Sequence, residues 1–395
     1  MNKKLFTLTF SIILLSSFFA GLLGIIMVSQ ETPLNSLKNL SVTLEIKQYR
    51  KGQLIRMVTE KDDMILENFA LFMEAFLTNP TAEVKATLHD GGGGGTEITV
   101  WSDDISKSIG MAYESGGPSS LAGKIGIGEG DTAATRSDYW LESEYAEKEA
   151  TATYSSGVIT IVSSIPITDT KTITEAIFFV TWWSSGEDGS RNYAFFRDVF
   201  TGVNVNDGDT LSLTYYLNLN NSGFTDQFGK LLAAIFSTIS NAEGSLRTVQ
   251  LTDITNNNRW FTVYGNTLSG SPFAYWFGSS VDYSGSYSGV FVAIGTGTTA
   301  NGRALYKLAT YNTENVITSQ EHYDDPTLEL YEYSTVTVSA TATISEAGVY
   351  RLWSWCSGPS SGSISFGNVM LWRLTFAGVS VPTSQTISVK FTVGT

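Results

Sequence analysis

Many short stretches of the chain alternate apolar and polar residues, which is the pattern of a half-buried β-strand. No regular strand–helix–strand alternation accompanies them, and this argues against a parallel α/β domain. Antiparallel β-structure is therefore expected. The stretches are EITVW (97–101), GVITIVSSIPI (157–167), TEAIFFVTW (174–182), TLSLTYYLNL (210–219), STVTVSATATI (334–344) and TISVKFTV (386–393).

Two other segments place their apolar residues at helical spacing. In residues 65–79 the stripe consists of Ile65, Phe69, Phe72, Met73 and Phe76; in residues 226–240 it consists of Phe228, Leu231, Leu232, Ile235, Phe236 and Ile239. We align the two segments at an offset of 163 positions and expect equivalent helices at 62–78 and 225–241. Because such a stripe usually packs on the protein's own sheet, each helix is expected to cover one.

The chain also repeats itself. The loop GEGDTAATRSDYWL (128–141) is matched by GTGTTANGRALYKL (295–308), with seven of fourteen positions identical at an offset of 167. Three further blocks match in the same order, and the offset grows as it would if the second copy had gained loop residues. They begin at Leu88 and Leu251 (offset 163), at Thr170 and Thr341 (offset 171), and at Gly202 and Gly378 (offset 176). This indicates an internal duplication.

The repeated loop is interpreted as a structural joint. Its glycines do not precede a helix, which argues against a phosphate-binding loop. A glutamate stands near the start of a later strand in both copies, where a carboxylate is disfavoured, so an ion pair with the loop arginine is expected. The predicted joint consists of Gly128, Gly130, Arg136 and Glu175 in the first copy and of Gly295, Gly297, Arg303 and Glu346 in the second.

The N-terminus differs from the rest of the chain. Lys3 and Lys4 precede a run without charge from Leu5 to Gln30, which is long enough to span a bilayer. Because the positive charges stand before the run, the residues after it are expected to be exported, to the cell surface or the extracellular space. Residues 5–28 would contact the membrane unless they are processed.

Together these patterns predict a mainly β protein. Two tandem duplicated antiparallel β-sandwich or jelly-roll domains, each with one packed helix, are expected after an N-terminal hydrophobic helix. The predicted ranges are 1–30 for the leader or membrane anchor, 31–221 for the first repeat with an N-terminal strand at 40–47, and 222–395 for the second repeat.

Composition excludes several function classes. The net charge is −14 and no cluster of Lys or Arg follows the N-terminus, so nucleic-acid binding is not expected. The single cysteine, Cys356, allows no disulfide within the chain, and the two histidines have no partner spacing. We therefore predict no catalytic residues, no metal site and no cofactor.

Two tryptophan-rich strand ends stand at matching places in the two copies. If exposed, they would stack on sugars and give the protein a surface glycan as ligand. The candidate residues are Trp182, Trp183, Trp353 and Trp355.

The strand LSVTLEIK (40–47) is of the same kind as the strands at 210–219 and 386–393, so two bodies come with three such strands and one is left over. Leu40, Val42, Leu44 and Ile46 form its apolar face. A surplus strand can cap its own sheet or complete the sheet of a neighbouring copy, and head-to-tail donation builds a filament. We expect donation, with the strand loose or at a sheet edge in a single chain.

The repeated motifs carry a resemblance. Gly-x-Gly-x-Thr-x-x-x-Arg, followed by Thr-Glu-Ala or Ser-Glu-Ala and then by RDVFTGVNVNDGDTLSLTYYL (197–217), resembles β-rich virion and tail-fibre-type proteins of prokaryotic viruses. This implies an assembly protein without catalytic residues. The apolar N-terminus departs from that family and is closer to β-sandwich subunits of archaeal surface filaments.

The function expected from the sequence is therefore that of an exported structural subunit. It would form a homopolymer, either a pilus-like extracellular filament or a virion appendage, through β contacts between copies. The alternative is a membrane-anchored adhesin or carbohydrate-binding surface protein. The tryptophans decide between these two, because an adhesin would present them to solvent.

Overall fold

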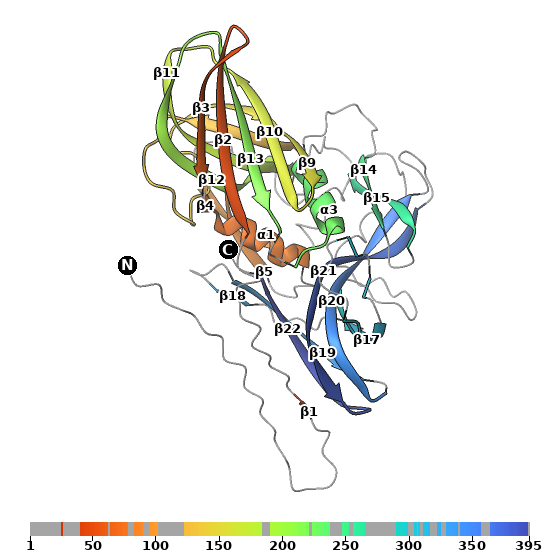
Figure 1. The fold of residues 1–395 in the computed structure, drawn as a ribbon. Helices are drawn as coiled ribbons and strands as arrows, with labels where there is room; N and C mark the ends of the chain where they lie inside the picture. Colours follow the sequence, from red (N-terminus) through yellow and green to blue (C-terminus); the bar gives the residue numbers. More distant parts are fainter. Residues whose placement is uncertain are drawn as a thin grey trace.

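Strands dominate the structure, as the alternating pattern predicts, and two helices accompany them in the part of the chain described (Figure 1). The computed structural model describes residues 25–26, 40–61, 64–77, 83–89, 95–101, 122–183, 190–220, 223–237, 247–252, 256–264, 290–298, 304–305, 307–308, 311–316, 322–324, 329–338, 340–356 and 364–393.

The first half of the chain forms two sheets. The five-stranded sheet has the order β3-β2-β13-β10-β9, and the seven-stranded sheet has the order β6-β5-β12-β11-β7-β8 with β4 paired to β12. The strands are β2 (Ser41–Arg50), β3 (Gln53–Lys61), β4 (Met64–Ile65), β5 (Glu83–His89), β6 (Gly95–Trp101), β7 (Ala122–Gly128), β8 (Glu144–Glu149), β9 (Thr151–Ser155), β10 (Val158–Pro166), β11 (Lys171–Trp183), β12 (Ser190–Val205) and β13 (Asp209–Asn218).

The second half forms two further sheets. One has the order β14-β15-β20-β16-β17 with β21 paired to β20, and the other has the order β1-β22-β19-β18. The strands are β14 (Arg247–Thr252), β15 (Asn258–Tyr264), β16 (Val290–Gly295), β17 (Tyr311–Val316), β18 (His322–Asp324), β19 (Glu329–Thr337), β20 (Ala342–Cys356), β21 (Ile364–Val381), β22 (Thr386–Val393) and, from the N-terminal segment, β1 (Ile25–Ile26).

Strand pairing in the two halves follows the same register. Glu175 of β11 lies opposite Gly128 of β7, and Glu346 of β20 lies opposite Gly295 of β16. The β11–β12 ladder is irregular between Ile173 and Glu175 and between Phe178 and Phe179; the β20–β21 ladder is irregular at the equivalent residues, 171 positions later. A shift of one residue in the strand pairing would turn every side chain to the opposite face of the sheet. The two ladders are irregular at the same two equivalent places, and this agreement supports the duplication strongly.

The turns that lead into β13 and β22 also match. Ile167 N donates to Asp209 O at 2.9 Å, and Val338 N donates to Gln385 O at 2.9 Å. Gly208 and Ser384 stand at the same place in these turns, with φ of 83° and 64°. Strand β22 is therefore the counterpart of β13.

The helices are α1 (Glu67–Leu77) and α3 (Asp226–Phe236), and Thr225 caps α3 by accepting a hydrogen bond from Phe228 N. Equivalent residues of the two helices are 159 positions apart in the chain, rather than the expected 163. Leu66 N donates to Phe195 O at 2.9 Å, and Thr225 N donates to Leu371 O at 3.0 Å. The difference is about one helical turn, and an apolar stripe looks the same after such a shift.

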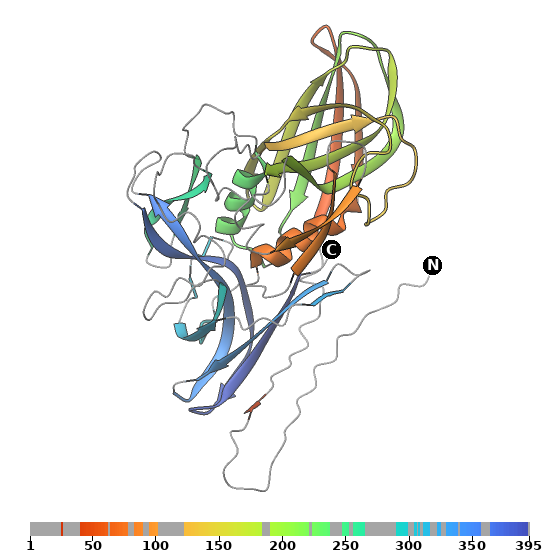
Figure 2. The same ribbon diagram turned by 180° about the vertical axis from the view of Figure 1, so that it is seen from behind.

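Each helix contacts strands of both halves. Helix α1 packs against β5 and β12 of its own half and against β18 and β19 of the other. Helix α3 packs against β14 and β21 of its own half and against β9 and β10 of the other. These contacts are equivalent pair by pair, and both views show the helices in the middle of the molecule (Figures 1 and 2).

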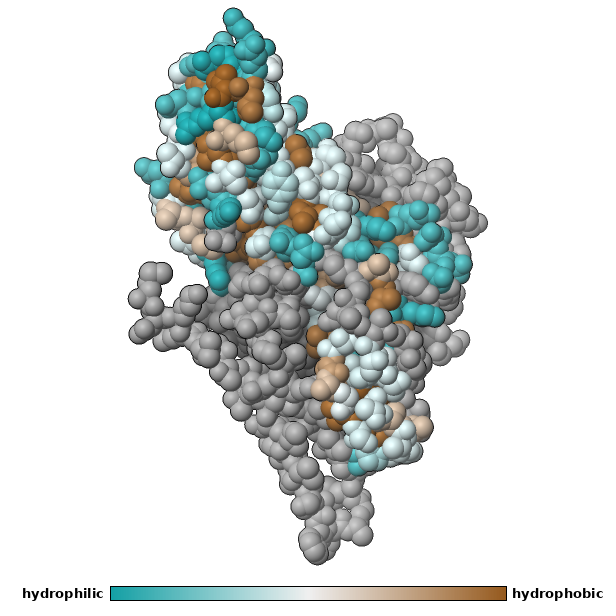
Figure 3. Space-filling view, in the orientation of Figure 1, coloured by the Kyte–Doolittle hydropathy of each residue, from teal (hydrophilic) through white to brown (hydrophobic). Residues whose placement is uncertain are grey.

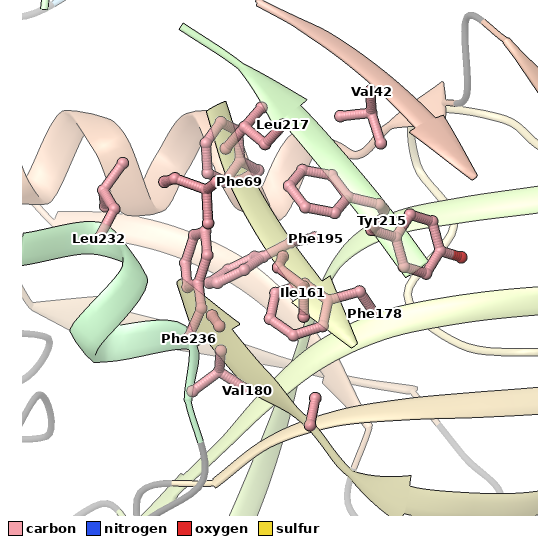
Figure 4. Close-up of a cluster of buried hydrophobic side chains, with 14 of the residues drawn as sticks. Val42, Phe69, Ile161, Phe178, Val180, Phe195, Tyr215, Leu217, Leu232 and Phe236 are labelled. Atoms are coloured by element: carbon pink, nitrogen blue, oxygen red, sulfur yellow. The ribbon is translucent and has the colours of Figure 1, made fainter. Parts of the chain in front are cut away.

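The main hydrophobic core consequently crosses the expected boundary at position 221. Phe69 of α1, Phe195 of β12 and Phe236 of α3 have ring centroids within 6.5 Å of one another. Figure 4 shows these rings beside Ile161 and Leu217 of the five-stranded sheet. Leu371 and Trp372 of β21 belong to the same buried cluster, so the two halves share this core.

The expected N-terminal hydrophobic helix falls almost wholly outside the described residues. Ile25 and Ile26 are described, and they form strand β1 rather than helix. In the described part of the chain, neither helix has the length and apolar character needed to cross a bilayer.

Candidate functional site, the repeated joint and the strand at 40–47

The carboxylate of Glu175 lies at the centre of the first joint. Its side chain is fully buried and faces the guanidinium of Arg197, which is only 3% exposed. Arg197 Nη2 and Nε donate to Oε2 of Glu175 at 2.9 and 3.3 Å. The two residues stand on neighbouring strands β11 and β12 as diagonal neighbours, a spacing that long side chains bridge.

Backbone amides complete the shell of this carboxylate. Gly130 N and Ser143 N donate to Oε1 at 3.0 and 2.8 Å, and Glu142 N donates to Oε2 at 3.0 Å. A buried charge is stable only when paired and hydrogen-bonded in this way. The carboxylate therefore ties the loop after β7 to the middle of the sheet.

The loop glycines are needed for close approach. A Cβ atom on Gly128 would lie 2.4 Å from Glu175 Oε1, and one on Gly130 would lie 2.6 Å from the same atom. Both distances are shorter than a real Cβ contact, so any side chain would push the carboxylate away from its donors. The repeated Gly-x-Gly therefore leaves the space that the glutamate carboxylate occupies.

The second joint reproduces the first. Arg373 Nη2 and Nε donate to Oε2 of Glu346 at 2.7 and 3.1 Å, while Gly297 N donates to Oε1 at 2.9 Å. Both side chains are at most 2% exposed. Gly295, the counterpart of Gly128, lies opposite Glu346 in the β16–β20 ladder.

In the first joint the arginine is not the predicted one. Arg197 takes the position at Glu175 that was expected for Arg136, whose carbonyl oxygen instead accepts a hydrogen bond from Glu67 N at 2.8 Å. Arg303 lies outside the described residues, so its pairing with Glu346 stays a prediction, and Arg373 pairs with Glu346 in the described part of the second copy. The sequence contained a signal for this: FFRDVF (195–200) and LWRLTF (371–376) each place one arginine in an apolar strand, at the offset of 176 already found for the following block.

Arg197 has a second acidic partner. Its Nη1 contacts Oδ2 of Asp138, whose side chain is 22% exposed. Burial lowers the pKa of Arg197, but the hydrogen bonds to Glu175 and Asp138 outweigh it and raise the pKa overall. With the charges of Arg197 and Glu175 paired and buried, the joint holds the loop against the two strands.

The strand predicted at 40–47 forms as β2, with alternating buried and half-buried residues. Its apolar face is buried: Leu40, Val42, Leu44 and Ile46 are at most 6% exposed. The expectation that it would lie loose or at an edge is wrong. Strand β2 is interior, between β13 and β3.

The reason is a hairpin that the pattern did not reveal. Lys51 and Gly52 both have positive φ, 53° and 79°, which suits the tight turn joining β2 to β3. Strand β3 then covers the outer edge of β2 from Thr43 to Arg50.

The end of β2 is fixed to the start of β13 by polar contacts. Asp209 is 1% exposed and accepts hydrogen bonds from Gln48 Nε2 at 2.8 Å and from Arg50 Nε at 2.8 Å and Nη2 at 2.9 Å. The hydrogen bond from Arg50 is the largest cause that lowers the pKa of Asp209 well below its ordinary value.

The tryptophans proposed for sugar stacking lie on the last residues of β11 and on β20, but their side chains fall outside the described part. Sugar stacking therefore stays a prediction. His89 is buried and stacks on Trp140 with centroids 4.0 Å apart. Among the described residues, no three His, Cys, Asp or Glu side chains gather as metal ligands would.

Comparison of the chain with protein-family models, curated proteins and solved structures found no match.

Proposed function

We propose that this chain is an exported structural subunit, of a pilus-like extracellular filament or of a virion appendage, that assembles through β contacts between copies. The observation that carries the proposal is a difference in strand pairing between the two halves. In the first half β13 is covered along its full length by β2, whereas among the described residues its counterpart β22 carries only the two-residue β1 on the same side. An open strand edge is a template for pairing with another chain.

The opposite end of the molecule offers a second candidate contact surface, of a different kind. Leu54, Ile55 and Met57 of β3 are 51%, 47% and 52% exposed, and β3 is the outer strand of its sheet within the described residues. Hydrophobic surface is visible over the β2–β3 hairpin at the top of Figure 3, while β22 lies towards the bottom of Figure 1. Different surfaces at opposite ends favour a head-to-tail contact that does not close.

The proposal also includes the division of the chain into domains. We propose two related β-sandwich bodies, 31–221 and 222–395, that exchange helix contacts, after a leader or anchor at 1–30. The matching registers and the two joints support a duplicated body. Because the titratable groups of both joints are buried and paired, we propose a mechanical role for them and no enzymatic one.

Electron microscopy of the purified full chain tests the proposal, and filaments are the expected result. Met57→Lys should reduce their number or length, since it places a charge on the exposed hairpin. Thr153→Lys, an exposed position on β9 at the other edge of that sheet, is the matched control and should leave them unchanged. A wild-type chain that stays monomeric at all concentrations would contradict the proposed function.

A further inference from the structure

The outer edge of β22 lacks what the outer edge of β13 has. Strand β2 pairs antiparallel with β13 over ten residues, from Ser41 opposite Asn218 to Arg50 opposite Asp209. On β22 the described residues place only Ile25 opposite Thr386 and Ile26 opposite Ile387, in parallel. Most backbone groups on that side of β22 thus lack a described strand partner.

A buried polar atom marks the same edge. Gln385 directly precedes β22 and is equivalent to Asp209, the first residue of β13, as the matching turns show. Asp209 is bound by Gln48 and Arg50 of β2, whereas Oε1 of Gln385 is buried with no hydrogen-bond partner among the described residues. Leaving a buried acceptor unpaired is costly, and at the equivalent position of the first half the donors come from β2.

The N-terminal segment contains a sequence that fits this place. Leu22, Gly24, Ile26, Val28 and Gln30 repeat, eighteen positions earlier, the spacing of Leu40, Val42, Leu44, Ile46 and Gln48 on β2. A strand from this segment that ran antiparallel to β22 in the register of β2 would place apolar residues on the core face. Its Gln30 would then stand near Gln385, as Gln48 stands near Asp209.

We propose that residues 22–32 of a second copy add to β22 as an antiparallel strand and complete the sheet of the second half. This deepens the proposed function and rests on it, since it names the contact that joins subunits. The donor is the segment before β2, and β2 itself stays in its own sheet.

The length of the chain favours a second copy as the donor. In both views the start of β22 lies at the far tip of the molecule, while β2 begins next to α1 (Figures 1 and 2). Within one chain, an antiparallel strand with Thr32 opposite Gln385 would leave residues 33–40 to run back along the eight residues of β22. Eight strand residues rise about 27 Å, and eight extended residues reach at most about 26–29 Å, so the tether would be fully extended. A neighbouring copy has no such constraint.

Disulfide trapping in the full chain tests the donation. In a Cys356→Ser background, Thr32→Cys is combined with Gln385→Cys, which corresponds to the opposed pair Arg50 and Asp209. Directly opposed residues of antiparallel strands are close enough for a disulfide. After mild oxidation of assembled protein, a ladder of covalent multimers is expected on a non-reducing gel, and each single variant should give dimers at most.

A second pair reports the alternative source. Ile25→Cys with Thr386→Cys matches the parallel contact within one chain. Efficient closure of this pair inside monomers, with no ladder from the first pair, would overturn the proposal. Normal wild-type filaments with no cross-link from either pair would also overturn it while leaving the proposed function intact, whereas absence of any multimer would overturn both.

A matched pair of substitutions tests which face of the segment is buried. Val28→Lys should abolish multimers, because position 28 corresponds to the buried Ile46, and Met27→Lys should retain them, because position 27 corresponds to the half-buried Glu45. Both changes add the same charge to the same apolar run, so an effect on export would affect both equally. Equal loss of multimers with both variants exported, or loss with Met27→Lys alone, would contradict the register.

Discussion

At the scale of single residues, the two buried carboxylates explain why the loop is repeated. Glu175 and Glu346 accept hydrogen bonds from a loop amide on one oxygen and from an arginine on the other. A buried carboxylate stabilises the fold only while its partners are present, since removing one partner leaves the other charge buried and unpaired.

Arg197→Met should therefore lower the free energy of unfolding by about 3–5 kcal/mol. The double variant Arg197→Met with Glu175→Gln should recover part of this loss, because it removes both charges. Urea denaturation followed by tryptophan fluorescence measures the difference. Arg136→Met is the control and should cost much less; equal costs would place the joint on Arg136 after all.

Asp209 gives a pH-dependent prediction. Its pKa is lowered in the folded state, so its contribution to stability is full above the unfolded value of about 4 and is lost as the pH falls below it. Asp209→Asn should reduce stability at neutral pH, and the gap to the wild type should shrink in more acidic solution. A gap that is constant from pH 7 to pH 3, measured by urea denaturation, would contradict this assignment.

At the scale of elements, β2 has become an interior strand of its own sheet. Val42 and Leu44 are fully buried and belong to the main hydrophobic core of the monomer. A strand held only by a neighbouring copy would add nothing to the stability of a dilute monomer.

Leu44→Ala should consequently destabilise the monomer by about 2–5 kcal/mol through the cavity it leaves. Thr43→Ala, one position away on the half-buried face, should cost far less. Thermal unfolding of dilute protein compares the two. Similar melting temperatures for wild type and Leu44→Ala would mean that β2 is not packed in the isolated chain.

At the scale of the whole molecule, the helices link the halves. Helix α3 follows the first half in the chain, yet Ser237 after it exchanges hydrogen bonds with Ala152 of β9, at 2.7 and 2.9 Å. Tyr154 of β9 also donates to Asp226 at the start of the same helix.

Calorimetry of the monomer should therefore show one main unfolding transition rather than two separate ones, because the halves share a core. Phe236→Ala should lower the temperature of the whole transition by several degrees, since its ring meets Phe69, Phe178 and Phe195. Two well-separated transitions, with only one moved by Phe236→Ala, would show that the halves unfold independently.

The sequence by itself determined the β class and the places of several strands, and it predicted the duplication. Alternation reports which face of a strand is buried, and it placed the apolar face of β2 correctly on Val42, Leu44 and Ile46. The repeated Gly-x-Gly and glutamate located both joints, because charged residues seldom stand in an apolar strand without a partner.

Tertiary structure decided the partners. A pattern of period two does not tell which strand lies alongside, so it could not show that β3 covers β2 or that Arg197 reaches Glu175 from the neighbouring strand. A helical stripe repeats after about one turn, so it could not separate an offset of 163 from the observed 159. The exchange of helix contacts between halves follows from packing distant segments around one core, which no local pattern records.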